Sequence, residues 1–266
     1  MNKGLGIVGA AAGFVSAILL TAGLPSVGKV FDAQCVSNND ATTTMTLAMP
    51  WQGSEAVEIR VPASVRFKVG TDWRAEATGP EAVLKHLQFS NGKLAFDQPM
   101  NLCGVDLKVA LSGPAVRQWT LAGSGALALE QLNQANLDIN VSGSGSATAT
   151  GKVGRARATL KGSGDLNLNG LALTDVDLDI HGSGSALASG TAEQAWISIS
   201  GSGDANLGQL VVKEANVRIK GSGNVDTSPV ENADVQIGGS GDVRLLKKPK
   251  SMQSRIYGSG RVIGAG

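Results

Sequence analysis

The chain has 266 residues, of which 36 are glycine and 4% are aromatic, and its 23 basic and 22 acidic residues leave a formal net charge of +1. This balance excludes nucleic acid as a partner, because phosphate binding requires a basic face. A hydrophobic fraction of 42% suffices for a packed core and excludes wholesale disorder. Glycine does not stand at every third position, which excludes collagen, so we expect it to form turns.

The N-terminal segment 1–33 is typical of an export signal. Lys3 precedes an uncharged, largely apolar run over residues 4–28, which is long enough either to be a cleaved signal peptide or to anchor the chain in a membrane. We therefore assign residues 1–33 to a signal peptide or an N-terminal membrane anchor. The protein is predicted to be exported to the periplasm or the cell surface, and the alternative to cleavage is anchoring in the inner membrane by residues 4–28.

Export bears on the two cysteines, Cys35 and Cys103. An oxidising compartment would allow them to pair, and a disulfide closing a loop of this size is worth a few kcal/mol in the chain-entropy model. Two separate thiols are the alternative, and the sequence leaves both open. Neither cysteine has the spacing of a metal site.

Residues 34–111 form a lead module of varied composition that holds most of the aromatic residues. Apolar residues alternate with polar ones in four short stretches, which predicts half-buried strands. These stretches are 57–61, 65–69, 94–96 and 105–109. Pro80 favours the start of a short helix that we extend to Leu87, and Asn91-Gly92 predicts a two-residue hairpin turn.

After residue 112 the chain repeats itself. The tripeptide Gly-Ser-Gly recurs eight times with a spacing close to nineteen, which is too regular for a flexible linker. The tripeptides begin at Gly123, Gly143, Gly162, Gly182, Gly201, Gly221, Gly239 and Gly258. We assign residues 112–266 to a domain of about eight repeats.

Apolar residues keep fixed positions relative to each tripeptide. The residues two positions before it are all aliphatic: Leu121, Val141, Leu160, Ile180, Ile199, Ile219, Ile237 and Ile256. The second residues after it are also apolar: Leu127, Ala147, Leu166, Ala186, Ala205, Val225, Val243 and Val262. The residue three positions before the tripeptide is polar in every repeat, so apolar and polar side chains alternate with the period of a strand.

Alternation inside a period near nineteen predicts that one strand of each repeat lies beside its copy in the next, with the apolar files inward. The predicted fold is all-β: a right-handed parallel β-helix or β-solenoid with Gly-Ser-Gly corners, preceded by the strand-rich lead module with its one short helix. Glycine supplies the backbone angles of the corner, and the serine is expected to hydrogen-bond neighbouring amides as a ladder.

Two coil lengths fit the repeat. Repeats that begin at Gly123, Gly162 and Gly201 are each one residue longer than those that begin at Gly143 and Gly182. Large residues beside small ones in successive layers would fill the core of a 19–20-residue coil. The same alternation fits a coil of about 39 residues with two corners. We favour the shorter coil.

The repeated Ile-x-Gly-Ser-Gly-[Asp/Ser/Asn] units, preceded by Ala56-Val57-Glu58-Ile59 and Thr78-Gly79-Pro80, resemble the bacterial head GIN domain of auto-transporter adhesins. The resemblance covers residues 45–266. It implies a right-handed β-helix-like fold in an exported envelope protein. It brings no established biochemical function and no catalytic residues.

The candidate chemical groups of the repeats favour structural roles. A serine that recurs in every corner is expected to belong to a hydrogen-bonding ladder, because a nucleophile needs an adjacent base. The two histidines, His86 and His181, are interpreted as ordinary solvated side chains, since an acid–base site requires much more around them. We predict no catalytic residue, no cofactor and no enzyme activity.

Acidic residues also recur, and we considered them as metal ligands. Asp165, Asp204 and Asp242 follow the corner in every second coil, but the period is not that of calcium-binding nonapeptides, so avoidance of like-charge stacking explains the spacing better.

The other charged groups are likewise interpreted without a metal. The run Asp175, Asp177, Asp179 faces outward and is expected to pair with Arg157 of the neighbouring coil. The basic loop 247–250 is interpreted as solvated, and no metal site is predicted.

Three function classes remain. The first is a non-catalytic exported cell-envelope protein, an adhesin-like or structural β-solenoid scaffold, with an envelope glycan or protein as partner. The second is a polysaccharide-active or polysaccharide-binding β-helix protein, a fold-level analogy that the scarcity of aromatic platforms disfavours: the repeats hold Trp119, Trp196 and Tyr257. The third is binding of a lipid or small ligand by the lead module. In addition, the open parallel edge at the C-terminal end of the solenoid predicts weak self-association.

Overall fold

The computed structural model describes residues 36–37 and 43–264, which fall within one compact unit, Gln34–Gly266. The predicted signal or anchor, residues 1–33, and Cys35 lie outside the described residues. Among the residues that the structure does describe, no helix has the length and apolar character needed to span a bilayer.

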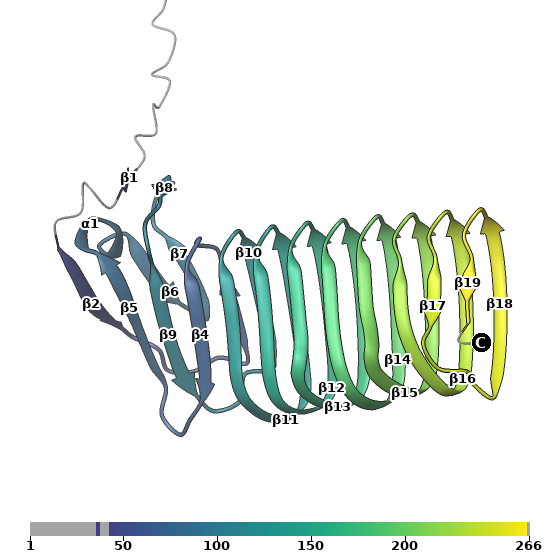
Figure 1. Cartoon of the computed structure of the whole chain (residues 1–266). Helices are drawn as coiled ribbons and strands as arrows, with labels where there is room; N and C mark the ends of the chain where they lie inside the picture. The colour runs from purple at the N-terminus through teal and green to yellow at the C-terminus, as the bar shows by residue number, and fades with distance from the viewer. Residues whose placement is uncertain (1–35, 38–42, 265–266) are drawn as a thin grey trace, which may run out of the picture. The chain divides into compact units, whose positions relative to one another are not determined.

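The predicted β-solenoid is confirmed, with about seven turns. The strands from β10 onward pair in parallel, each beside its copy in the next coil, and Figure 1 shows them stacked along one axis. They are β10 (Gln118–Gly123), β11 (Ala126–Gly143), β12 (Ser146–Gly162), β13 (Asp165–Gly182), β14 (Ser185–Gly201), β15 (Asp204–Gly221), β16 (Val225–Gly239), β17 (Val243–Leu245), β18 (Ser251–Gly258) and β19 (Val262–Ile263).

The register fixes the length of the coil. Leu160 pairs with Ile180, and Ile180 pairs with Ile199. Residues two positions before successive tripeptides are therefore direct neighbours. The shorter coil, with one Gly-Ser-Gly corner, is confirmed, and the longer coil with two corners is wrong.

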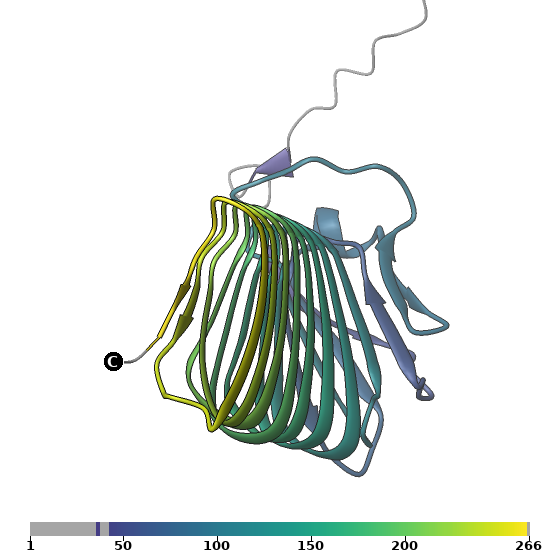
Figure 2. The same cartoon turned by 90° about the vertical axis from the view of Figure 1, so that its right-hand side faces the viewer.

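Each coil bends twice. The sharp bend is the Gly-Ser-Gly corner, where the arrowheads of β11 to β16 end along one edge in Figure 1. The second bend is rounded and lies inside the long strands, where the register shifts, for example between Leu129 and Leu132 or between Thr148 and Thr150. Figure 2 shows two faces joined by these bends. We call the face that leads into the corners the pre-corner sheet and the face that leaves them the post-corner sheet.

The core lies between these two sheets. Both predicted apolar files are buried from the first coil onward, as at Ile180 and Ile199, and full burial of such a side chain contributes about 1.5–3 kcal/mol. Large and small residues alternate in successive layers, since Leu129, Ala149 and Leu168 are all buried. The files end at the last coil, where Ile256 is 42% exposed.

The corner is held by backbone hydrogen bonds between coils. The N–H of Ser202 donates to the carbonyl of Gly182 at 2.8 Å, and the other corners from Ser144 onward repeat this bond. The expected ladder of serine hydroxyls is wrong, because within the described residues no corner serine hydroxyl makes a hydrogen bond and all eight serines are exposed. The backbone already satisfies the amides that those hydroxyls were expected to bind.

The lead module continues both sheets of the solenoid. Strand β3 pairs in parallel with β10, and β4 pairs in parallel with β11. Beyond them, β5 is antiparallel to both β2 and β9. The elements are β1 (Val36–Ser37), β2 (Thr44–Met49), β3 (Ala56–Ile59), β4 (Ser64–Val69), β5 (Arg74–Pro80), α1 (Glu81–Leu84), β6 (Leu87–Ser90), β7 (Lys93–Phe96), β8 (Leu102–Cys103) and β9 (Lys108–Gly113).

Two local predictions for the lead module have different outcomes. The hairpin at Asn91-Gly92 is confirmed: both residues have positive φ, 50° and 73°, and they join the antiparallel strands β6 and β7. The helix starts after Pro80 as predicted, but it ends at Leu84. The extension to Leu87 is wrong, because Leu87 already begins β6 and pairs with Phe96.

Candidate functional site

Outward side chains of the pre-corner sheet stand in rows that cross the strands. The register there has no shift from β12 to β15, so each outward residue lies beside its counterpart in the next coil. One row contains Arg157, Asp177, Trp196 and Asn216, in that order. The only large aromatic side chain of this row therefore has charged neighbours on one side and an amide on the other.

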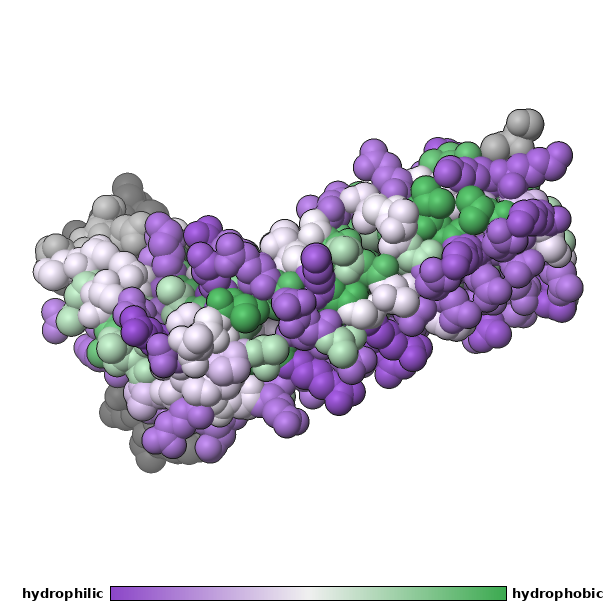
Figure 3. Space-filling model, turned by 90° about the horizontal axis from the view of Figure 1, so that it is seen from below, coloured by the Kyte–Doolittle hydropathy of each residue, from purple (hydrophilic) through white to green (hydrophobic). Residues whose placement is uncertain are grey.

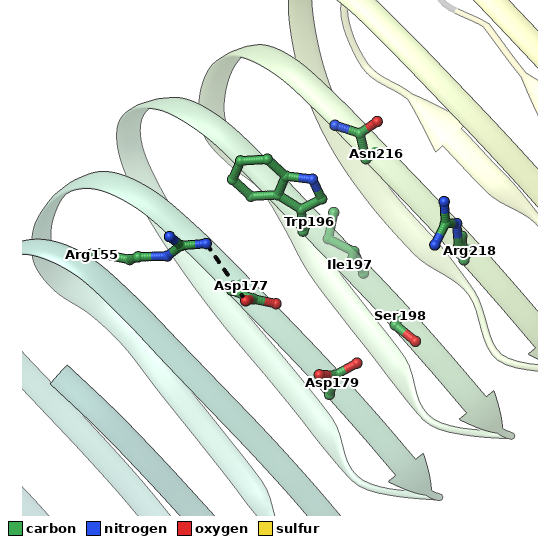
Figure 4. Close-up of a pocket in the computed structure, with 8 residues that line it drawn as sticks. All are labelled: Arg155, Asp177, Asp179, Trp196, Ile197, Ser198, Asn216 and Arg218. Carbon is green, nitrogen blue, oxygen red and sulfur yellow. Dashed lines mark ion pairs between the residues drawn. The ribbon is translucent and has the colours of Figure 1, made fainter. Parts of the chain in front are cut away.

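A hollow of about 380 Å³ surrounds this tryptophan. We call it the Trp196 hollow. Figure 4 shows its lining, in which Trp196 stands between Arg155 on one side and Asn216 on the other. The lining residues come from four successive strands, β12 to β15, and are Arg155, Asp177, Asp179, Trp196, Ile197, Ser198, Asn216 and Arg218.

One side of the Trp196 hollow is held by ion pairs. An oxygen of Asp177 lies 3.0 Å from the guanidinium of Arg157 and 3.9 Å from that of Arg155. The Asp177 side chain is only 20% exposed. Arg155 in turn lies 5.6 Å from the centre of the Trp196 ring, which is a cation–π distance. The indole thus has a charged neighbour, Arg155, at cation–π distance, and that arginine lies beside Asp177.

Two opposite charges of the hollow remain unneutralised. Asp179, Ser198 and Arg218 stand in one row, with the serine between the two charged residues. Among the described residues, neither Asp179 nor Arg218 takes part in an ion pair. Two strand spacings, about 10 Å, separate their backbones. The hollow therefore offers a hydrogen-bond acceptor and a donor on opposite sides of a small side chain.

The polar surface continues toward the C-terminal coils. A second hollow of about 250 Å³ lies over β15, β16 and β18. Its lining includes Glu214, Asn232, Asp234 and Gln253, and it shares Asn216 with the Trp196 hollow. The two hollows together follow the solenoid axis across several coils.

The rounded bends carry a different kind of surface. Figure 3 views this edge and shows apolar side chains in a strip between hydrophilic ones. A hollow of about 320 Å³ lies there, lined by Leu173, Val211, Val212 and Val230 among others. This hollow belongs to the solenoid, and binding of a lipid or small ligand by the lead module stays a prediction.

The two histidines differ from each other in the structure. His181 is exposed beside the corner at Gly182, as a solvated side chain would be. For His86 the solvated interpretation is wrong: Nδ1 lies 3.0 Å from Asp97 Oδ1, Nε2 lies 3.1 Å from Gln98 Nε2, and the side chain is 24% exposed. His86 therefore ties the helix end to the segment that follows β7.

Two of the three acidic residues that follow the corners, Asp204 and Asp242, accept hydrogen bonds from the next coil, and Asn224 between them does the same. Asp204 Oδ1 accepts from the N–H of Asn224 at 2.9 Å, Asn224 Oδ1 accepts from Asp242 at 3.1 Å, and Asp242 Oδ1 accepts from Arg261 at 2.9 Å. Avoidance of like charge is thus an incomplete explanation of the spacing, because the side chains also satisfy backbone donors. In the part of the chain that the structure describes, no three His, Cys, Asp or Glu residues are grouped to hold a metal.

The other charged candidates have definite partners. The predicted pairing of the acidic run with Arg157 is confirmed at Asp177. The lysines of the basic loop are exposed, as interpreted, and Lys250 also forms an ion pair with Glu231 at 2.7 Å. Trp119 faces inward and is buried, Tyr257 is exposed, and Trp196 lines a hollow. From the sequence, Trp196 was named only as one of the few aromatic residues of the repeats, and it was not connected with Asp179 and Arg218.

Comparison with known proteins agrees with the resemblance in the repeats. The sequence profile of a family described as "Putative auto-transporter adhesin, head GIN domain" matches residues 55–249. The chain belongs to this family. This head GIN domain has no match among curated proteins.

Solved structures resemble this head GIN domain in fold. A "putative lipid binding protein" from Parabacteroides distasonis superposes with a TM-score of 0.78 at 18% identity, covering 88% of this chain and 100% of its own. A "putative adhesin" from Parabacteroides merdae has a TM-score of 0.74 at 20% identity, covering 87% and 99%. Another "putative adhesin", from P. distasonis, has a TM-score of 0.70 at 20% identity, covering 84% and 97%. At these identities the likeness establishes the shared fold.

Proposed function

We propose that this head GIN domain is a non-catalytic, exported cell-envelope protein with an adhesin-like function. The observation that carries the proposal is the pre-corner sheet, where the register runs without a shift from β12 to β15 and presents ordered rows of polar side chains. A surface built in this way is fixed before any partner arrives. Little conformational entropy is then lost on binding.

Export to an oxidising compartment is part of the proposal. Cys103 in β8 is disulfide-bonded, and disulfides persist outside the reducing cytosol. The adhesin-like family is consistent with a surface or extracellular position. Residues 1–33 would direct export, either as a cleaved signal or as an inner-membrane anchor over residues 4–28. Cell fractionation together with the mass of the mature protein separates these two outcomes.

A polysaccharide-binding or polysaccharide-active protein is the second candidate, and the Trp196 hollow favours it. An exposed aromatic ring among polar groups is the usual composition of a pocket for a polar ligand with an apolar face. Catalysis would additionally need an acid and a base or nucleophile placed around one bond. Among the described carboxylates of the hollow, Asp177 is already engaged by two arginines.

One experiment tests the proposed function against the enzymatic alternative. The purified chain is incubated with whole cells, envelope fractions and a panel of polysaccharides, and both retention of the protein and release of reducing ends are measured. We expect retention without release. Release of sugar products would overturn the non-catalytic assignment, and a lack of retention on every surface would overturn the adhesin-like one.

A further inference from the structure

We propose that the Trp196 hollow binds a neutral saccharide chain, with a sugar ring stacked on the indole and its hydroxyls bonded to Asp179, Asn216 and Arg218. The inference rests on the proposed function, because both assume that the outer surface of the solenoid binds a partner. It goes further by naming the ligand class and the residues that hold it.

The position of Trp196 is the first reason. It is the only aromatic residue between residues 120 and 256, and it stands outward on a sheet whose other outward residues there are polar. Its side chain is half-buried, so one part of the indole packs against its neighbours while another part borders the hollow. An indole beside hydroxyl-binding groups suits a sugar, which has an apolar C–H face and a polar rim.

The charges of the hollow define which saccharide fits. Arg155 and Arg218 balance Asp177 and Asp179 among the lining residues, so the site has no formal net charge when all four are ionised. A lining without formal net charge gives nucleic acids and strongly acidic polymers no net electrostatic attraction. A neutral sugar hydroxyl both donates and accepts, and can therefore bond Asp179 and Arg218 at the same time.

The geometry is fixed before the ligand arrives. An oxygen of Asp177 lies 3.0 Å from the guanidinium of Arg157, and Arg155 lies 3.9 Å from Asp177 and 5.6 Å from the centre of the Trp196 ring. The strands that carry these residues are bound to neighbours on both sides. A ring anchored in this way needs little reordering when a sugar stacks on it.

The length of the ligand follows from the second hollow. Because the two hollows share Asn216, a chain of sugars that begins at Trp196 can continue along the axis over β15, β16 and β18. Asn232, Asp234 and Gln253 supply further donors and acceptors there. We therefore expect affinity to rise from a disaccharide to a hexasaccharide of the same sugar.

The test uses the full chain on an array of neutral glycans, followed by calorimetry with hexaoses of glucose, xylose and N-acetylglucosamine. Trp196→Ala is expected to weaken binding by about tenfold or more. The matched control is Asn140→Ala, an outward residue of the same sheet outside both hollows, and it should leave the Kd within about twofold.

A second variant keeps the test decisive if Trp196→Ala fails to fold. Asp179→Ala removes an acceptor that makes no ion pair among the described residues, so the solenoid should stay folded while binding weakens by about tenfold. Thermal unfolding of each variant is measured alongside. Binding should also change little between about 0.05 M and about 0.5 M NaCl, because a neutral ligand is not screened.

Three results would overturn the inference. They are the absence of binding to any neutral glycan, an unchanged Kd in both Trp196→Ala and Asp179→Ala, and a steep loss of affinity with salt. If the chain still adheres to cells in these cases, the proposed function stands and only the saccharide site is wrong. If it adheres to nothing, the proposed function fails as well.

Discussion

At the scale of single residues, Gly201 shows why the first residue of a corner is glycine. Its φ is +132°, a conformation that residues with a side chain rarely adopt. A Cβ at this position would also overlap the carbonyl oxygen of Gly182 in the preceding coil. That oxygen accepts the N–H of Ser202, so the backbone there cannot move aside without losing a hydrogen bond between coils.

The two causes can be separated by a pair of substitutions. Gly190 also has positive φ, +113°, but its nearest potential contact is Leu171 O at 3.8 Å. Gly190→Ala should therefore cost only the backbone strain, about 1–3 kcal/mol, and Gly201→Ala should cost clearly more. Urea unfolding of both variants measures the difference. Equal losses of stability would show that close packing between coils does not dictate glycine at the corner.

Asp242 gives a prediction for the dependence on pH. The hydrogen bond from the Arg261 side chain, assisted by the Arg261 backbone N–H, holds the pKa of Asp242 below its ordinary value of 3.8. A carboxyl with a lowered pKa stabilises the fold above pH 3.8, and this contribution is lost as the pH falls through the lower folded value.

The measurement is an NMR titration of the Asp242 carboxyl, with hydrogen exchange of residues 261–263 followed over the same range. In Arg261→Gln the pKa should return toward 3.8, and exchange in the last coil should rise already at neutral pH. An identical titration in the two proteins would contradict the assigned role of Arg261.

At the scale of elements, the short parallel pair β1 and β8 bears on the fate of the cysteines. Val36 pairs with Leu102, and Ser37 pairs with Cys103. Cys103 is disulfide-bonded, and Cys35, although outside the described residues, is the only other cysteine of the chain. We therefore expect these two cysteines to form a disulfide, which the sequence alone left open.

The mass of the intact protein tests this pairing. Without reductant, the exported protein should be lighter by two hydrogen atoms than after reduction, and peptides containing Cys35 and Cys103 should be linked. Cys103→Ser should lower the free energy of unfolding by about 2–4 kcal/mol, because the unfolded chain loses a cross-link. Reaction of both thiols with a blocking reagent in the native protein would contradict the disulfide.

The elements also show how much of the fold can be predicted from the sequence. The inward files, the corners and the length of the coil follow from spacing, because burial requires the same type of side chain in every repeat, as at Ile180 and Ile199. No residue type recurs at a fixed position to mark the rounded bend in the sequence, since its register shifts differ from coil to coil. The row of Asp179, Ser198 and Arg218 also follows from the spacing, because each of them stands three positions before a tripeptide. The Trp196 hollow was missed because spacing does not show which outward side chains border a hollow or which of them form ion pairs.

At the scale of the whole solenoid unit, the two ends of the core differ. At the N-terminal end, helix α1 places the buried residues Val83 and Leu84 against the core, and Figure 1 shows α1 at the end opposite β18. At the other end, Met252 and Ile256 are 50% and 42% exposed, and both pair with buried residues of β16. The apolar files therefore stop at β18 without a further layer.

This asymmetry predicts how copies would associate. Among the described strands, β18 pairs only with β16, so one edge of it is available to another strand. Because the C-terminal end exposes the apolar residues Met252 and Ile256, two copies should meet end to end through this same surface and form a closed dimer, whereas a fibre would need two different ends. The contact is small, so we expect a weak dimer.

Sedimentation equilibrium over a wide concentration range tests this dimer. Ile256→Glu should abolish it, because a carboxylate at the open end of the core would be buried without a partner in the dimer. Leu187→Glu is the matched control: Leu187 is an exposed apolar residue on β14, away from the last coil, and its substitution should leave the dimer intact. A strictly monomeric mass at the highest concentration would contradict the dimer, and growth without limit would show that the N-terminal end is open as well.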